Sequence, residues 1–189
     1  MTVQPGDSRE TELIRLCKRN KAGAQEKLYT RYFGYAMGVG LRYCINRDDA
    51  LEVVNDAFIK IFGAIQSFDE ALPFKPWLRR IVINCSIDQR RKNQRLLYTE
   101  DIETADAVAI NISAIDKLQM DDLLKMLDML PEMLRTVFNL VEVDGYSHEE
   151  IAKMIGIPAS SSRVYLSRAK DRLRAMLTNP NNAWYGRVS

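Results

Sequence analysis

The stretch from Gly145 to Leu177 constrains the fold more than any other part of the sequence. It has the pattern of two amphipathic helices joined by a short turn. Ser147 and Glu150 have the spacing of a capping box, in which each side chain bonds the backbone N–H of the other residue. The run Gly156-Ile157-Pro158 then ends the first helix. The pattern predicts a helix-turn-helix.

The second helix of this motif, expected over residues 159–177, has two chemically different faces. Helical spacing predicts a buried stripe of Ser162, Leu166, Ala169, Leu173 and Leu177. The residues expected to contact DNA lie outside that stripe: Ser160, Ser161, Arg163, Val164, Tyr165, Ser167 and Arg168. Short hydroxyl side chains let a helix enter the major groove, and arginine reaches guanine edges or phosphates. The alternative is a helical hairpin with a solvated basic face. Turn length, capping box and exposed hydroxyls together favour DNA binding.

Length and composition limit the class of protein. The chain has 189 residues, 47% of them apolar, which is enough for a packed core in one domain or two small ones. No apolar run approaches the roughly 20 residues of a membrane-spanning helix, and the N-terminus lacks a signal-peptide core, so a cytoplasmic location without membrane insertion is expected. Cys17, Cys44 and Cys85 are far apart without a CxxC spacing, so reduced thiols are expected rather than a redox or zinc site.

Charge is distributed unevenly along the chain, although the net charge is only +2. Residues 1–92 contain 16 Lys and Arg against 11 Asp and Glu. Residues 93–130 contain 3 against 8, and residues 131–189 contain 8 against 6. Two basic ends around an acidic middle predict two modules that face nucleic acid, with a different kind of segment between them.

The apolar spacing predicts helices throughout, with no strand pattern and no internal repeat. Besides the helix-turn-helix, the expected helices cover residues 10–19, 24–43, 49–65, 77–92, 116–130 and 131–143. Asp48 or Asp49 is expected to cap the third of them. Residues 93–115 are acidic and contain few large apolar residues, so they are expected to form an extended or partly ordered linker.

The helix over residues 49–65 is expected to leave one large apolar residue outside its buried face. The inner face comprises Val53, Val54, Ala57, Phe58, Ile61 and Phe62. Leu51 lies outside this stripe, near Glu52, Asn55 and Asp56. It either contacts another protein or is covered by neighbouring helices, and the sequence favours neither alternative.

An aromatic loop precedes a second basic helix. Residues 66–76 carry Phe68, Phe74 and two prolines. The helix that follows is expected to have an apolar stripe of Trp77, Leu78, Ile81, Val82 and Cys85. The polar groups beyond that apolar stripe are Arg79, Arg80, Asn84, Arg90, Arg91 and Lys92. Cationic tracks beside aromatic side chains are typical of sites for single-stranded nucleic acid. The alternative is a core tryptophan with a solvated arginine face.

Three runs in this order resemble the extracytoplasmic-function group of sigma-70-type sigma factors: DDALEVVNDAFIKIF (49–63), FKPWLRRIVINCSIDQRRK (74–92) and LPEMLRTVFNLVEVDGYSHEEIAKMIGIPASSSRVYLSRAKDRL (130–173). The helix-turn-helix alone fits many regulators, whereas the two earlier runs narrow the choice. The resemblance implies an all-α fold of two small helical domains joined by an acidic flexible linker. Sigma region 2 is expected over residues 10–95, the linker over 96–115 and region 4 over 116–178, with tails at 1–9 and 179–189.

The resemblance also implies roles for individual residues. The set expected to bind the β′ clamp helices of core RNA polymerase comprises Leu51, Glu52, Asn55 and Asp56. The set expected to bind and melt the −10 element comprises Phe68, Phe74, Trp77, Arg80, Asn84, Asp88 and Arg91. The exposed face of the recognition helix matches the −35 contact. Leu51 stands where the family more often has an acidic residue, and Asn55 stands where glutamine is usual. Ser162, Val164 and Tyr165 depart from the family's common recognition helix, so the −35 sequence stays open.

The implied function is that of an alternative sigma factor, not an enzyme, which binds core polymerase and promoter DNA and needs no cofactor or metal. The family further implies an anti-sigma partner, which the residues do not identify. One rival is a helix-turn-helix regulator, which gives no reason for the 74–92 helix and its aromatic loop. The other is an enzyme built on His148, the only histidine, which lacks a triad, a metal-ligand spacing or a glycine-rich phosphate loop around it.

Overall fold

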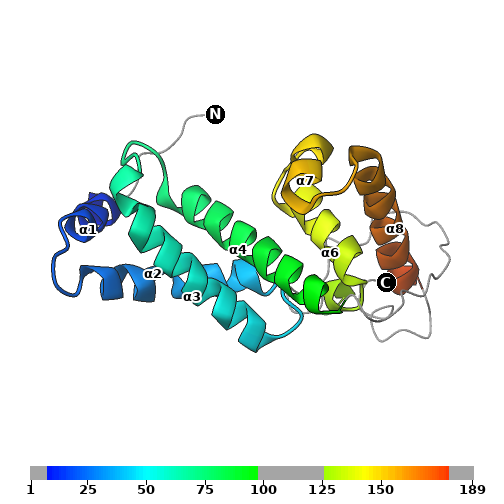
Figure 1. Cartoon of the computed structure of the whole chain (residues 1–189), viewed down its shortest axis with the longest axis horizontal. Coiled ribbons are helices and arrows are strands. Elements are labelled where there is room, and N and C mark those ends of the chain that lie inside the picture. The colour runs from blue at the N-terminus through cyan, green and yellow to red at the C-terminus, as the bar shows by residue number, and fades with distance from the viewer. Residues whose placement is uncertain (1–7, 98–125, 179–189) are drawn as a thin grey trace. The chain divides into compact units, whose positions relative to one another are not determined.

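The computed structural model describes residues 8–97 and 126–178, and every regular element within these ranges is helical (Figure 1). The chain divides into two compact units, with the boundary between Leu96 and Leu97. No helix in the described ranges is long and apolar enough to cross a membrane. The prediction of an all-α fold of two small helical domains is confirmed.

The first unit consists of α1 (Ser8–Lys18), α2 (Ala24–Gly40), α3 (Arg47–Ala64), the short 3-10 helix η1 (Ile65–Ser67) and α4 (Phe74–Leu97). Helix α1 packs on α2 and η1, and α2 packs along α3 (Figure 1). Side chains from all four long helices are buried between them, with the largest at Tyr32, Phe58 and Phe74. Of the predicted inner face of α3, only Phe62 remains partly exposed.

The starts of α3 and α4 differ from the sequence-based expectation. The cap of α3 is Asn46, whose side chain accepts the backbone N–H of Asp49, rather than Asp48 or Asp49 itself. Several residues here are good caps, so sequence alone does not choose among them. Helix α4 starts at Phe74, because Pro76 is tolerated within a first turn, where its missing N–H has no intrahelical partner to lose.

The far end of α4 also differs. The expected break at Asn93 was wrong, because α4 continues to Leu97 through residues that favour helix. Helix α4 also buries more than its predicted stripe: Ile83 and Ile87 are in the core, and Arg90, expected on the polar side, is 9% exposed. The rest of the expected linker lies outside the described residues.

The second unit contains α6 (Glu132–Phe138), the π-helical turn η3 (Asn139–Val143), α7 (His148–Ile155) and α8 (Ala159–Thr178). The expected helix over residues 131–143 is therefore helical to its end but widens in its last turn. Of the expected helix over residues 116–130, the structure describes only the final residues, and these are helical to Asp128. The core of the unit joins this segment and α6 to α8 through Met126, Leu127, Leu130, Leu134, Ala169, Leu173 and Leu177.

The helix-turn-helix is formed as predicted. Glu150 donates its backbone N–H to the Ser147 hydroxyl at 3.2 Å, and Ser147 donates its own N–H to the Glu150 carboxylate at 2.8 Å. Gly156 ends α7 in the left-handed conformation with φ of 75°, which glycine adopts without a Cβ clash. The two helices pack directly on each other. The capping box and this glycine fix where α7 begins and ends.

Candidate nucleic-acid and protein interfaces

Helix α8 presents most of the predicted −35 set to solvent. Ser160, Arg163, Val164, Ser167 and Arg168 are exposed, with 47% of Val164 accessible. Ser161 is partly buried, and so is Tyr165, which packs against the core cluster of the second unit. The exposed members follow one another around one side of the helix, as a groove-binding surface requires.

The predicted buried position of Ser162 is confirmed and explained by an unexpected partner. Its side chain is fully buried, and its Oγ lies 2.9 Å from Nδ1 of His148 on α7. A buried hydroxyl without a partner would be destabilising, so this hydrogen bond makes the serine acceptable in the stripe. The only histidine of the chain thereby ties the two helices of the motif together.

Ion pairs surround the recognition helix. Arg163 Nη2 lies 2.7 Å from Glu149 Oε1 on α7, and Lys170 Nζ lies 2.8 Å from Glu142 Oε1 on η3. Both partners of the first pair are more than half exposed, so a phosphate can replace the carboxylate at little cost. Arg168 forms no ion pair with any residue in the described ranges. It is the recognition-helix cation that is most available to a ligand.

Helix α3 carries the set predicted to bind polymerase on its outer surface. Glu52, Asn55 and Asp56 are exposed, and Leu51 is 39% exposed, so neighbouring helices do not cover it. Tyr29 of α2 donates its hydroxyl to Asn55 Oδ1 at 3.1 Å. Sequence analysis missed Ile59, which is 70% exposed. It follows Leu51 and Asn55 at steps of four residues, a spacing that places all three on one face.

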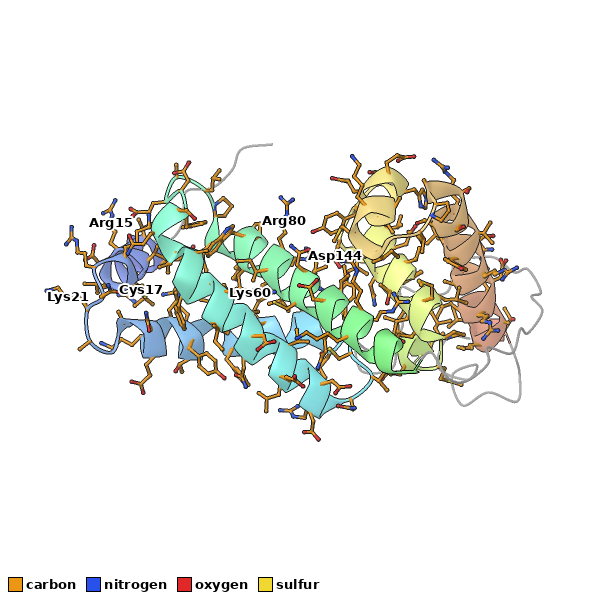
Figure 2. The ribbon with its side chains drawn as sticks, in the orientation of Figure 1. Arg15, Cys17, Lys21, Lys60, Arg80 and Asp144 are labelled. Atoms are coloured by element: carbon orange, nitrogen blue, oxygen red, sulfur yellow. The ribbon has the colours of Figure 1, made fainter. Side chains whose placement is uncertain are left out.

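Four members of the predicted −10 set share one exposed face of α4. Arg80, Asn84, Asp88 and Arg91 are all exposed and follow one another at helical spacing. Arg80 projects from α4 into solvent, whereas Lys60 of α3 lies beside α4 (Figure 2). Lys60 Nζ is 3.2 Å from Asp88 Oδ2, so this aspartate is engaged by α3.

The aromatic rings of the −10 set do not form an exposed platform on which bases could stack. Phe68 is 5% exposed and Phe74 is fully buried, so neither ring offers a free face in this conformation. Their ring centroids are 5.5 Å apart, and Trp77 lies 4.8 Å from Phe68 and 5.6 Å from Phe74. Trp77 alone is partly exposed. These three rings form a hydrophobic cluster that closes the base of the loop, and the assignment of Phe68 and Phe74 to the −10 set stays a prediction.

The exposed apolar group of that loop is one that sequence analysis did not select. Leu72 is 58% exposed, and it lies between the two buried phenylalanines. A leucine between two phenylalanines, in a loop that also contains two prolines, gives no distinguishing signal in the sequence. Its exposure becomes evident only when the aromatic cluster is seen to be closed.

A polar groove between α3 and α4 is lined by members of both predicted sets. Residues of both helices line it: Glu52, Asp56, Lys60, Cys85, Asp88, Gln89, Arg91 and Lys92. Gln89 donates to Glu52 Oε2 at 3.0 Å across the groove. Burial raises the pKa of the Cys85 thiol, against the opposing effect of the Lys60 ammonium. The described ranges contain no group of three or more His, Cys, Asp or Glu placed to hold a metal ion.

Comparison with known proteins agrees with this arrangement. A model of sigma-70 region 2 matches residues 28–96, and a model of sigma-70 region 4 matches residues 120–173. The chain is 29% identical over 173 residues to an ECF RNA polymerase sigma-E factor of Haemophilus influenzae, covering 85% of this chain and 91% of the relative. It is 27% identical over 176 residues to an RNA polymerase sigma-H factor of Pseudomonas aeruginosa, covering 87% and 91% respectively.

A solved structure shares the fold. It is the sigma factor RpoE in complex with the anti-sigma factor NepR from Bartonella quintana, with a TM-score of 0.52 and 24% sequence identity. The match covers 85% of this chain and all of the other chain.

Proposed function

We infer the function of this chain from its family: it belongs to the sigma-70 family of RNA polymerase sigma factors and, within it, to the extracytoplasmic-function group. It binds core RNA polymerase, recognises the −35 and −10 promoter elements and promotes DNA melting for transcription initiation. Sigma factors are initiation factors rather than enzymes. The observation that carries this function is the pairing, in one chain, of a region 4 helix-turn-helix with a region 2 helix whose exposed face is cationic.

We propose that the two units divide the work on promoter DNA. The exposed face of α8 enters the major groove at the −35 element, where Arg168 contacts a base edge and Arg163 exchanges Glu149 for a phosphate. The exposed face of α4 (Arg80, Asn84, Asp88 and Arg91) contacts the opened −10 strand. Flipping a base out of the stack costs a few kcal/mol, which these contacts and the loop before α4 must offset.

We propose that the outer face of α3 docks on the polymerase. Leu51 and Ile59 supply exposed apolar surface, and Glu52, Asn55 and Asp56 supply the polar contacts around it. By this assignment, region 2 extends over residues 10–95 and region 4 over residues 116–178, with the intervening linker spanning 96–115. The chain acts where polymerase acts, in the cytoplasm.

We also propose an anti-sigma partner. The sigma factor RpoE of the solved neighbour is bound to the anti-sigma factor NepR. The exposed apolar and charged faces of α3 and α8 supply surfaces that such a partner would cover.

Run-off transcription tests the function directly. Purified chain is added to core polymerase that lacks other sigma factors, with genomic promoter fragments as templates. Specific start sites that depend on the chain are the expected result. A chain that stimulates only polymerase already carrying another sigma factor is instead a helix-turn-helix regulator. Absence of any start site with an active core enzyme contradicts the proposal.

A further inference from the structure

A network of polar contacts joins the C-terminal end of α1 to the start of the loop before α4. Glu70 in that loop lies 2.7 Å from Arg15 Nε through Oε2 and 3.2 Å from Lys18 Nζ through Oε1. One carboxylate thus accepts from two cations on neighbouring turns of α1. The Lys18 and Glu70 side chains are 19% and 25% exposed, so their pair is better shielded from water than an open surface pair.

Backbone groups take part in the same network. Lys18 donates its ammonium to the carbonyl oxygen of Phe68 at 2.7 Å, and Gln66 donates its side-chain amide to the carbonyl oxygen of Lys18 at 2.5 Å. The second bond satisfies a carbonyl at the end of α1 that has no partner within the helix. Arg15, Lys18, Gln66 and Glu70 are called the α1 latch below.

Helix α1 is linked to the other end of the loop only indirectly, through Tyr32 of α2. Tyr32 donates its hydroxyl to the Glu10 carboxylate of α1. The ring of Tyr32 lies 4.9 Å from the ring of Phe74, the first residue of α4. Phe68 is therefore held directly by Lys18 of α1, and Phe74 packs on Tyr32 of α2, whose hydroxyl is bonded to α1.

Between these two ends the loop turns on Asp69 and exposes its tip. Ala71 donates its backbone N–H to Asp69 Oδ1 at 2.9 Å, and Leu72 donates its own to the Asp69 carbonyl oxygen at 3.0 Å. Ala71 and Leu72 are exposed. A loop fixed at both ends and turned in the middle presents its tip in one conformation.

We propose that the α1 latch positions the loop over residues 68–73 for strand separation at the −10 element, with Leu72 as the side chain presented to the unstacked strand. This inference rests on the proposed function of region 2. A preformed loop loses little conformational entropy when it captures DNA, so more of the contact energy remains for melting. The latch also neutralises Glu70, whose charge would otherwise repel the phosphate backbone. Its α1 half, Arg15 and Lys18, lies before the segment that matches the region 2 pattern, which begins at residue 28.

Open-complex formation on two templates tests the latch. Holoenzymes are made from core polymerase and the full chain carrying Glu70→Gln, Arg15→Gln or Lys18→Met. On a duplex promoter the open complex is expected to fall roughly three- to tenfold, as loss of one or two such bonds predicts. On the same promoter already unpaired across the −10 element, the loss is expected to be less than about twofold, because melting is no longer required. Equal losses on both templates overturn the proposal.

Matched variants separate positioning from general damage. Arg19→Gln and Lys21→Met remove exposed cations near the same end of α1 without touching the latch, and they are expected to behave as wild type. The exchanged pair Arg15→Glu with Glu70→Arg is expected to recover at least half of the duplex activity that either single change removes. If the double variant forms no more open complex on the duplex promoter than the less active single variant, a direct role of the Arg15–Glu70 pair is contradicted.

Hydrogen exchange of the free chain makes the latch testable without transcription. The Ala71 and Leu72 amides, both hydrogen-bonded to Asp69, are expected to exchange faster in Glu70→Gln and Lys18→Met, while amides within α2 and α3 keep wild-type rates. Unchanged exchange at Ala71 and Leu72 overturns the latch. If the wild-type chain starts no transcripts but the variants show this faster exchange, the proposed function is overturned while the structural role of the latch is supported.

Discussion

Neighbouring residues of α8 have very different access to a ligand. Ser162 is fully buried and bonded to His148, whereas Arg163 is exposed but paired with Glu149. Arg168 is exposed and makes no ion pair within the described ranges. Arg168 can therefore contact DNA without breaking an ion pair, whereas Arg163 must first release Glu149.

Replacing Arg168 by alanine is expected to weaken −35 recognition. A bidentate contact between arginine and guanine is worth roughly 1–3 kcal/mol, and its loss relaxes specificity at the contacted base pair. Competition binding of holoenzyme to the cognate promoter and to promoters substituted at each −35 position measures both effects. An identical preference profile in wild type and Arg168→Ala removes Arg168 from the base-contacting set.

Glu70 makes the stability of the first unit depend on pH. The hydrogen bond and charge of Arg15, with those of Lys18, hold the pKa of the Glu70 carboxyl below its ordinary value. A lowered pKa in the folded state contributes stability above the unfolded-state pKa of about 4.3, and this contribution disappears as the pH falls through the folded-state pKa. At pH 7 the Tm of Glu70→Gln is therefore expected to be lower than that of wild type, and this difference should shrink as the pH falls below about 4.3.

The control for this pH dependence is Glu26→Gln. Glu26 is an exposed carboxylate of α2, and its replacement is expected to leave a small difference in Tm at every pH. A Glu70→Gln difference that persists unchanged in acid shows that the effect comes from packing rather than from charge.

At the scale of elements, the parts that sequence predicted well are those decided by neighbouring residues. The start of α7 follows from Ser147 and Glu150, and its end follows from Gly156, all within ten residues of one another. The start of α3 was predicted less well, because Asn46, Asp48 and Asp49 are all good caps and only the folded backbone selects Asn46. Burial of Phe68 and Phe74 and the latch between Arg15 and Glu70 depend on contacts between distant segments, which local patterns do not encode.

The capping box makes a quantitative prediction for α7. Replacing Ser147 by alanine removes the acceptor for the Glu150 N–H and is expected to cost about 1 kcal/mol of unfolding free energy. Threonine at the same position keeps the hydroxyl and should lose much less. Urea unfolding, monitored through the loss of helical content, measures the unfolding free energy of both variants. Alanine and threonine variants of equal stability would show that α7 is held by packing alone.

For the whole molecule, two cationic faces lie on separate units, and both are proposed to contact the same promoter. Each phosphate neutralised by a lysine or arginine releases condensed counterions, so promoter affinity should fall steeply with salt. Linking the two sites in one chain raises the effective concentration of the second contact once the first has formed. Each promoter element, −35 or −10, should therefore raise promoter affinity more when the other element is present than when it is absent.

Salt dependence tests this division of work. Arg80→Gln in the first unit and Arg163→Gln in the second are each expected to reduce the slope of log affinity against log salt by about 1. The double variant should reduce it by about 2, because sites in separate units are independent. Promoter binding by holoenzyme at several potassium chloride concentrations gives the slopes. A double variant with the slope of either single one would mean that the two arginines contact the same phosphate or none.

The closed aromatic cluster at the base of the −10 loop has an optical consequence. The chain has two tryptophans, and Trp77 is the one that packs 4.8 Å from Phe68. With Trp184 changed to phenylalanine, all indole emission of the free chain comes from Trp77, the residue that borders this loop. Any rearrangement that lifts Phe68 away admits water to the indole and moves its emission to longer wavelength. The free chain therefore carries its own fluorescent probe, which reports opening of the aromatic cluster without an attached dye.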